Sequence, residues 1–338
     1  GAVKYFLLGS FAAAILLFGS ALLYGATGHT DLVGIRASVA AGEADAVLTI
    51  FALVMLIVGL AFKVGAVPFH MWVPDAYEGA ATPVTTFMSV VVKSAAVAVL
   101  IRVLLGAFGD PSTMGLYTGW TPVIIILAVI SMIYGNLAAL AQSSVKRMLA
   151  YSSIAHAGYI LVGFAAASEV GSFAVSAVLY YMAAYTVSNV LAFGSLILMG
   201  SKGKEAVSYD DLAGAGRRHP MAAFPFVIGV LSLLGMPPTA GFFGKYYVFS
   251  AAVQAGGVMV WVAVLGVLAS AVGAYYYLKV IVYLYMREPE EDAPIAVPMQ
   301  STYVVVALVL AGYYVMKMGI TPSRYLDWAV AAASSFVG

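Results

Sequence analysis

Four lysines lie inside long apolar stretches of the sequence: Lys63, Lys93, Lys245 and Lys279. None of the fifteen Asp and Glu residues lies at a similar place within such a stretch. An ionised ammonium in hydrocarbon costs about 3 to 15 kcal/mol, so such residues face a wet or protein-lined interior and usually serve ion or proton movement. We therefore interpret the four lysines as candidate stations for a mobile proton.

A buried lysine can act as such a station because burial favours its neutral amine, whereas a nearby carboxylate favours the charged ammonium. A carboxylate that moved toward and away from Lys63 would make this lysine take up and release a proton without covalent chemistry. Lys93 follows on the next apolar stretch, with hydroxyls at Thr85 and Ser89 that can hold water. His156 lies inside another stretch, and a neutral imidazole accepts on one nitrogen and donates on the other, as a relay requires.

These residues also have structural interpretations. A lysine at membrane depth can extend its ammonium to the interface or hydrogen-bond an unwound carbonyl. This alternative is strongest for Lys279, which follows three tyrosines and lies closer to one end of its stretch. His156 could be a structural histidine, and both interpretations stay open for His70, which lies near two acidic residues. Lys146 and Arg147, at a predicted helix start, are interpreted as topology anchors.

The composition identifies the class of protein. Of 338 residues, 63% are hydrophobic and 9% are charged, with a mean hydropathy of +0.99, which leaves too little polar surface to solvate a globule. We predict an all-α, polytopic transmembrane bundle. The net charge of +1 argues against a nucleic-acid partner, and the absence of cysteine excludes disulfides, thiolate metal sites and a cysteine-held iron–sulfur cluster. No nucleotide-binding motif is present, so we expect no cofactor or metal in this chain.

Apolar runs of about 20 residues, the length that crosses about 30 Å of hydrocarbon, predict nine membrane helices. The first begins shortly after Gly1, without a Met or a signal-peptide pattern, so we expect the sequence to be the remainder of a longer protein. The predicted spans are 4–25, 46–69, 83–107, 120–141, 144–167, 170–200, 219–254, 257–286 and 301–319.

Two of the predicted helices are interrupted. The seventh is too long for one span and contains Gly235-Met236-Pro237-Pro238, so we expect two half-helices joined by an unwound turn. The second ends in a related way, at Lys63, Gly65 and Pro68. Such breaks are tolerated only where the freed backbone groups meet protein or water, and they mark the transport site of repeat-built transporters.

The basic residues outside the membrane core, in loops or toward the ends of spans, predict the orientation. If the fifth loop is cytoplasmic, helix alternation places eight basic residues on that side and four on the other, as the positive-inside rule favours. The first helix then starts at the cytoplasmic face. The cytoplasmic set is Lys4, Lys146, Arg147, Lys202, Lys204, Arg217, Arg218 and Arg287, and the opposite set is Arg36, Arg102, Lys317 and Arg324.

Three long motifs resemble the antiporter-like subunits of respiratory complex I, the NADH-quinone oxidoreductase. They run from Gly59 to Val84, from Asn136 to Tyr159 and from Gly235 to Lys245, and the match extends in order from Lys4 to at least Tyr285. The Ser-Ser-Ile-x-His-x-Gly-Tyr run and the lysine after the Pro-Pro break are more similar to subunit N than to its sister subunits L and M.

The resemblance implies a proton-translocating subunit of fourteen helices, built from two inverted five-helix repeats and here lacking its first five helices. Within one transmembrane domain, 1–107 would be the remainder of the first repeat, 120–286 the second repeat and 300–338 a C-terminal helix. The acid that pairs with Lys63 in this family would lie on a missing helix. Lys4 aligns with a charged residue of the first half-channel.

The resemblance also implies the site and the partners. We expect other complex I subunits to contact this chain, especially the antiporter-like subunit M and the small subunit K, in a bacterial plasma membrane. Quinone, NADH, FMN and iron–sulfur clusters would belong to those other subunits. The expected relay is Lys63, Lys93, His156 and Lys245, with Lys4, Lys279 and His70 as secondary candidates.

An alternative function is a cation/proton antiporter subunit of the Mrp type, or the antiporter-like subunit of a membrane-bound hydrogenase. These proteins share the helix breaks and the lysines. Co-purification with quinone-reducing NADH activity would separate the two functions. A purely structural scaffold is disfavoured, because a scaffold has no use for four unpaired buried lysines.

Overall fold

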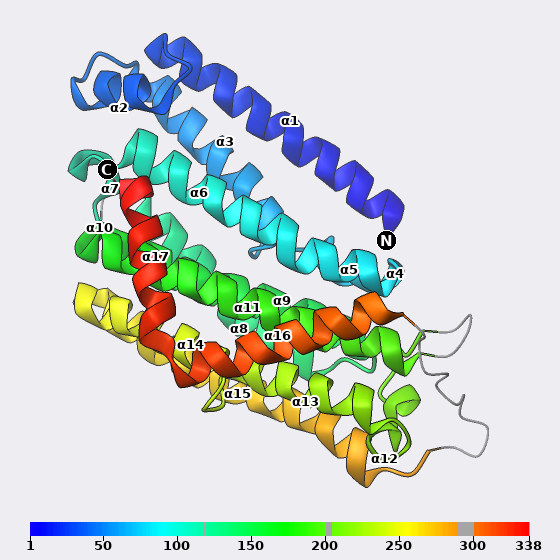
Figure 1. Cartoon of the computed structure of the whole chain (residues 1–338). Helices are drawn as coiled ribbons and strands as arrows, with labels where there is room; N and C mark the ends of the chain where they lie inside the picture. Colours follow the sequence, from blue (N-terminus) through cyan, green and yellow to red (C-terminus); the bar gives the residue numbers. More distant parts are fainter. Residues whose placement is uncertain (118, 201–204, 290–300, 338) are drawn as a thin grey trace.

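The computed structural model describes residues 1–117, 119–200, 205–289 and 301–337. These residues form a bundle of helices without a β-strand (Figure 1). The predicted all-α polytopic class is confirmed, because eight of the described helical segments are long and apolar enough to cross a membrane. They are α1 (Ala2–Thr27), α3 (Ala46–Val64), the segment Thr82–Phe108, α8 (Thr121–Leu140), the segment Val145–Val170, α11 (Ser172–Met199), α15 (Val258–Met286) and α16 (Thr302–Ile320).

Two of these segments consist of several helices. Thr82–Phe108 contains a π-helical turn, and Val145–Val170 ends in a short extra turn. The parts of Thr82–Phe108 are α5 (Thr82–Phe87), the π-turn (Met88–Val92) and α6 (Lys93–Phe108), and the parts of Val145–Val170 are α9 (Val145–Ala165) and α10 (Ala167–Val170). Short elements lie at the ends of the bundle: α2 (Leu32–Ala40), α4 (Val73–Gly79), α7 (Pro111–Met114), a 3-10 turn (Asp210–Leu212) and α12 (Ala215–Arg218). The last helix, α17 (Pro322–Val337), crosses the bundle.

The predicted seventh span is split into two half-helices, α13 (Pro220–Leu234) and α14 (Ala240–Ala255), as expected. The second predicted helix, α3, is also interrupted at the expected place. Both helices end on a glycine in the left-handed region, Gly65 with φ 81° and Gly235 with φ 89°. Glycine lacks the Cβ that makes this conformation costly for other residues, so it ends a helix where the next turn must leave the axis.

The centre of the bundle is α9, the most enclosed of the eight spans: 94% of its most apolar window is buried. It packs closely along α8, because glycines on both helices let the backbones approach. A Cβ on Gly135 of α8 would lie 2.6 Å from the Ala155 nitrogen, and one on Gly158 of α9 would lie 2.7 Å from the Ala128 oxygen. The polar side chains of α9 are therefore kept away from lipid by neighbouring helices.

The α8–α9 contact gives a first prediction. The substitution Gly158→Ala should destabilise the fold by about 1 to 3 kcal/mol, because the added methyl overpacks a backbone contact that cannot move aside. The thermal unfolding midpoint of the purified complex measures this. Gly25→Ala on α1 is the matched control, since its Cβ would have no neighbour within 4 Å. Equal midpoints for the two variants would contradict the proposed contact.

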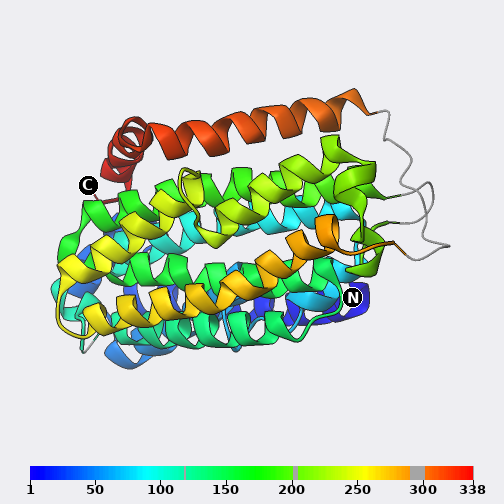
Figure 2. The same ribbon diagram turned by 90° about the horizontal axis from the view of Figure 1, so that it is seen from below.

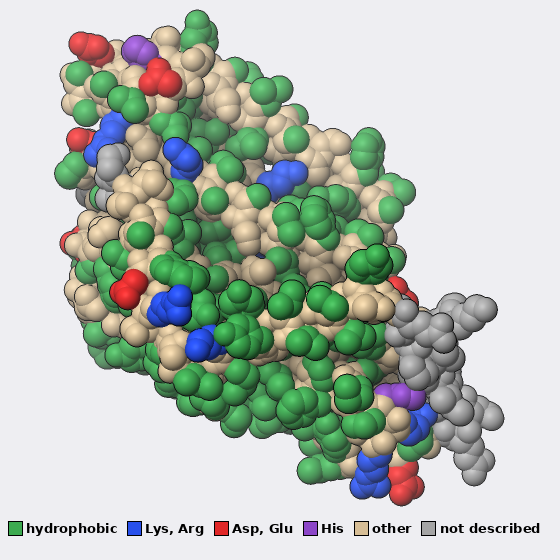
Figure 3. Space-filling view, in the orientation of Figure 1, with side chains coloured by type: hydrophobic (Ala, Val, Ile, Leu, Met, Phe, Trp, Pro, Cys, Tyr) green, Lys and Arg blue, Asp and Glu red, His purple; other side chains and the backbone are tan. Residues whose placement is uncertain are grey.

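The remaining helices cover this core. In Figure 2, α16 lies along the outside of the bundle, and Figure 1 shows α17 crossing over the side of α11. Apolar side chains cover the long face in Figure 3, whereas acidic side chains and histidines gather at the two ends. Lys4 and Arg147, predicted for the same side of the membrane, both contact Asp75 at one of these ends. Lys202 and Lys204 lie outside the described residues.

Candidate functional site

Lys93 lies in the interior, at the first position of α6 after the π-turn, with 3% of its surface exposed. Its Nζ donates to the carbonyl oxygen and to Oγ of Ser153 on α9, both at 2.6 Å. The Tyr185 hydroxyl donates to the same Oγ at 2.9 Å, and the ammonium lies 5.5 Å from the Tyr185 ring centroid. Among the described residues no carboxylate pairs with Lys93. Its proton is therefore shared only with neutral oxygens.

His156 lies one turn further along the same face of α9, and its exposed fraction is also 3%. Its Nδ1 is 2.6 Å from the Tyr181 hydroxyl and its Nε2 is 3.1 Å from the Tyr277 hydroxyl. In the neutral ring one nitrogen donates and the other accepts, so the two hydroxyls take opposite roles. The Tyr277 hydroxyl also bonds Ser152 Oγ, which continues the network along α9. His156 thus connects α9 to α11 and α15 with both ring nitrogens.

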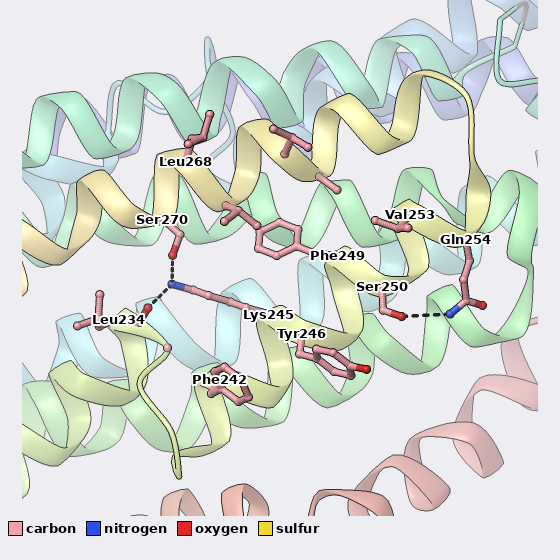
Figure 4. Close-up of a pocket in the computed structure, with 14 residues that line it drawn as sticks. Leu234, Phe242, Lys245, Tyr246, Phe249, Ser250, Val253, Gln254, Leu268 and Ser270 are labelled. Atoms are coloured by element: carbon pink, nitrogen blue, oxygen red, sulfur yellow. Dashed lines mark hydrogen bonds between the residues drawn. The ribbon is translucent and has the colours of Figure 1, made fainter.

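Lys245 on α14 reaches back into the helix break (Figure 4). Its Nζ donates to the Leu234 carbonyl oxygen and to Ser270 Oγ on α15, both at 2.7 Å. The end of α13 leaves carbonyls without helical partners, and the ammonium satisfies one of them. As with Lys93, no described carboxylate pairs with Lys245, which is 8% exposed.

Tyr159, one further turn along α9, lies between the histidine and this lysine. Its ring meets the His156 ring edge-on at 5.5 Å between centroids, and the Lys245 ammonium lies 5.1 Å from the Tyr159 centroid. The Tyr159 hydroxyl accepts from Asn136 Nδ2 at 2.9 Å, and Asn136 Oδ1 accepts from the Tyr276 hydroxyl at 2.9 Å. One face of α9 therefore presents polar groups from Ser153 to Tyr159 without interruption by an acid.

Two cavities adjoin this line. A cavity of about 10 Å³ beside His156, Tyr185, Ser188 and Ser232 has roughly the space that the centre of one water molecule needs, and its walls offer polar partners. A groove of about 650 Å³ between α14 and α15 reaches Lys245 from the bundle surface (Figure 4). Most of its walls are apolar, with Lys245 and Ser270 at one end and Ser250 and Gln254 at the other.

The other expected site residues lie apart from this line. Lys63, in the last turn of α3, is half-buried and lies 6.0 Å from the Phe62 ring centroid. Lys279 is also half-buried, with its ammonium 4.3 Å from the Tyr209 ring centroid. His70 is buried against the edge of Tyr134, and its Nδ1 has no hydrogen-bond partner in the described part of the chain. The structure thus brings Lys93, His156 and Lys245 into one neighbourhood and leaves these three residues outside it.

Lys4 joins an ionic cluster at the end of the bundle. Its Nζ lies 2.5 Å from Asp75 Oδ2, and Arg147 binds Asp75 Oδ1 at 2.8 Å and Glu78 Oε2 at 3.0 Å. The hydrogen bond from Lys4, together with that from Arg147, outweighs burial and holds the pKa of the Asp75 carboxyl below its usual range. This cluster ties α1 and α9 to α4, the segment that follows the break after Lys63.

The interpretation of Lys146 and Arg147 as topology anchors alone is too simple. Lys146 has 1% of its surface exposed, less than any of the four lysines singled out in the sequence. It donates to the Ala80 carbonyl at 2.7 Å and to Glu205 Oε2 at 2.8 Å. Sequence reasoning missed this pair because Glu205 lies far along the chain, in a loop. It also passed over Tyr181 and Tyr277, for which tyrosines inside apolar spans were the available signal.

Groups arranged in this way can pass a proton between neutral and cationic nitrogen and oxygen atoms. Among the described residues no three His, Asp or Glu side chains are close enough together to hold a metal ion. The buried groups of the line can each gain or lose one proton, or pass one on through a hydroxyl.

The chain has relatives among known proteins. Residues 1–272 match the family model described as NADH:quinone oxidoreductase/Mrp antiporter, transmembrane. The chain is 58% identical over 335 residues to NADH-quinone oxidoreductase subunit N 1 of Sorangium cellulosum, and 45% identical over 338 residues to subunit N of Trichlorobacter lovleyi. Each alignment covers 98% of this chain and 66% of the relative, so the chain spans about two thirds of the length of these proteins.

Solved structures show the same relationship. A chain of respiratory complex I from Thermus thermophilus with bound aureothin is 38% identical, with a TM-score of 0.80 over 96% of this chain and 68% of that one. A chain of the Mrp complex from Dietzia has a TM-score of 0.84 over 98% of this chain and 67% of that one, but only 20% identity, and so shares the fold. With its apolar spans and these bacterial relatives, the chain is a multi-pass protein of the bacterial plasma membrane. It belongs to the NADH:quinone oxidoreductase/Mrp antiporter transmembrane family, in which it is similar to subunit N.

Proposed function

We propose that this chain is part of a proton-translocating membrane subunit of NADH-quinone oxidoreductase, driven by quinone reduction in other subunits. The observation that carries the proposal is the line of polar groups from Lys93 through Ser153, His156 and Tyr159 to Lys245. Within the described residues, no acid pairs with either lysine of this line and holds a proton in place. If both lysines were only structural, the protein would bear the free-energy cost of two buried ammonium groups and gain no proton transfer from them.

The proposed route begins at Lys93. Its ammonium releases a proton through Ser153, and a water molecule in the adjoining cavity carries the proton to His156. The imidazole accepts on one nitrogen and releases from the other, and the tyrosine hydroxyls on both sides reset its tautomer. Lys245 then receives the proton and holds it at the helix break. No covalent bond other than those to the proton changes.

The first half of the pathway would use Lys63 and the secondary candidates. Each helix break has a lysine beside it: Lys63 lies just before the first break, and Lys245 lies after the second. Lys4 and His70 lie near the segment that follows the first break, and Lys279 lies toward the end of α15 that adjoins α12. In this proposal Lys63 exchanges its proton with a carboxylate of the longer protein, because no described acid pairs with it here.

The two breaks support an origin in inverted repeats. In each, the glycine and the following residue donate to one carbonyl in the preceding turn, Ala61 at the first break at 2.9 Å and Leu231 at the second at 3.0 Å. We propose that 1–107 is the remainder of the first repeat, 120–286 the second repeat, and 300–338 a C-terminal part that contains α16 and α17. Equivalent breaks would then have equivalent roles in the two halves.

The proposed partners are the antiporter-like subunit M and the small subunit K, as the relationship to subunit N implies. NADH, FMN, iron–sulfur clusters and quinone would bind in other subunits, and this chain would contribute only proton movement. The mostly apolar faces of α1 and α15 offer surface for such neighbours or for lipid.

The test uses the purified complex that contains this chain, reconstituted in liposomes. We expect NADH and quinone together to drive protons across the membrane, and we expect an imposed sodium or potassium gradient alone to drive none. The controls are an uncoupler, which should abolish the pH gradient, and omission of quinone. Exchange of protons for sodium or potassium without NADH would instead support an antiporter of the Mrp type.

A further inference from the structure

Glu205 joins two helices that the relay depends on. It lies in the segment between α11 and the 3-10 turn, at the end of the bundle where α9 begins. Its Oε1 accepts from the Thr82 backbone nitrogen at 2.9 Å, and its Oε2 accepts from Thr82 Oγ1 and from Lys146 Nζ, both at 2.8 Å. One carboxylate therefore bonds the first residue of α5 and the second residue of α9.

This contact differs from an ordinary surface ion pair. Exposed pairs contribute little, because water already solvates both ions. Here the Glu205 side chain is 42% exposed, but the Lys146 side chain is 1% exposed, and its ammonium also donates to the neutral Ala80 carbonyl. Loss of the carboxylate would leave a buried ammonium without its counter-charge.

The carboxylate is charged under ordinary conditions. Burial alone would raise the pKa of Glu205, but hydrogen bonds from Lys146 and Thr82 outweigh burial and hold that pKa below its usual value. Glu205 can thus accept all three hydrogen bonds at once at neutral pH.

The two helices meet again deeper in the protein, at the relay. From Thr82 to Lys93 the chain advances eleven residues, or about 16 Å of helix, and from Lys146 to Ser153 it advances seven, or about 10 Å. Between Thr82 and Lys93 lies the π-turn, where hydrogen bonding departs from the α-helical pattern. The position of Lys93 against Ser153 therefore depends on how the outer end of this span is held.

We propose that Glu205 is a positioning residue of the relay, which fixes the start of α5 to the start of α9 so that Lys93 meets Ser153. The inference rests on the proposed function for its effect on proton movement, but the fixation itself does not. Displacement of a reacting group by about 1 Å can cost about 100-fold in rate, so a loose outer end would slow transfer while leaving the relay groups intact.

The experiment compares Glu205→Gln with Asp210→Asn in the whole complex. The glutamine can still accept from Thr82 but lacks the charge that Lys146 needs. Asp210→Asn removes one charge from an exposed position, the first residue of the 3-10 turn that follows this segment. We expect Glu205→Gln to lower NADH-driven pumping about tenfold and to shift its pH profile, with the KM for NADH unchanged. Asp210→Asn should match the wild type.

A second measurement reads the position directly. Spin-labelled unnatural amino acids at Val84 on α5 and at Leu137 on α8, both exposed, report the distance between α5 and the α8–α9 pair. Glu205→Gln should broaden or shift this distance distribution, and the double variant Glu205→Gln/Lys146→Met should restore part of it by removing the unpaired ammonium.

These readouts separate the two ideas. An unchanged distance distribution in Glu205→Gln overturns the fixation whatever happens to pumping. A changed distribution with wild-type pumping and pH profile overturns the role of Glu205 in the relay. If the wild-type complex does not pump protons, the proposed function fails, whereas the distance measurement still decides whether Glu205 fixes the helices.

Discussion

Lys93→Ala should lower NADH-driven proton pumping by about tenfold or more while the complex still assembles. A positioned proton-transfer group typically contributes about 10²- to 10⁴-fold to the step it serves, so its loss should slow pumping by at least about tenfold. The loss follows from the site: Lys93 is buried, and the described chain offers no ion-pair partner that could take its place. Quinone reduction should fall in parallel if pumping and turnover are obligatorily coupled.

Lys93→Arg separates a titrating role from a purely electrostatic one. Arginine keeps the positive charge and can still donate to Ser153, but its guanidinium does not release a proton in the accessible range. We expect this variant to pump as poorly as the alanine variant. Pumping is measured as the pH gradient in proteoliposomes, normalised to the amount of assembled complex. Full pumping by Lys93→Arg would show that Lys93 acts through its charge alone, and full pumping by Lys93→Ala would show that Lys93 takes no part in proton transfer.

Lys245→Ala should impair translocation more than Lys279→Ala does. Lys245 is 8% exposed, meets Tyr159 next to His156 and holds the Leu234 carbonyl at the helix break. Lys279 is half-buried and lies against Tyr209, away from this line. We expect about a tenfold or larger loss of pumping for the first substitution, from the contribution of a proton-transfer group, and less than about twofold for the second.

Lys245→Met controls for the loss of volume in the groove between α14 and α15. Methionine fills a similar space without a titrating group, so it should pump no better than alanine. Reconstituted complexes with equal assembly, followed by a pH-sensitive dye, provide the comparison. The reverse ranking of Lys245→Ala and Lys279→Ala would place the pathway along the other lysine.

Much of the fold was predictable from the sequence because the physics of the bilayer is local. A run of about 20 apolar residues forms a helix in hydrocarbon, since only a helix satisfies all backbone hydrogen bonds within the run itself. All nine predicted spans have their counterparts in the structure. The breaks at Gly65 and Gly235 were equally local, because glycine followed by proline cannot continue a helix. Lys93, His156 and Lys245 stood out for the same reason, as polar groups in apolar stretches.

The tertiary structure alone decided which helices these residues meet. Helical periodicity assigns Ser153, His156 and Tyr159 to one face of α9, but it does not reveal that Lys93 comes to Ser153 from α6 or that Tyr181 and Tyr277 bond the imidazole. The burial of Lys146 was also hidden. At the start of a helix a lysine ordinarily reaches water, and only the packing of Glu205 and the Ala80 carbonyl around it makes an enclosed ammonium stable. A charge inside a protein is stabilised by partners, and partners distant in sequence are chosen by the packing of the whole bundle.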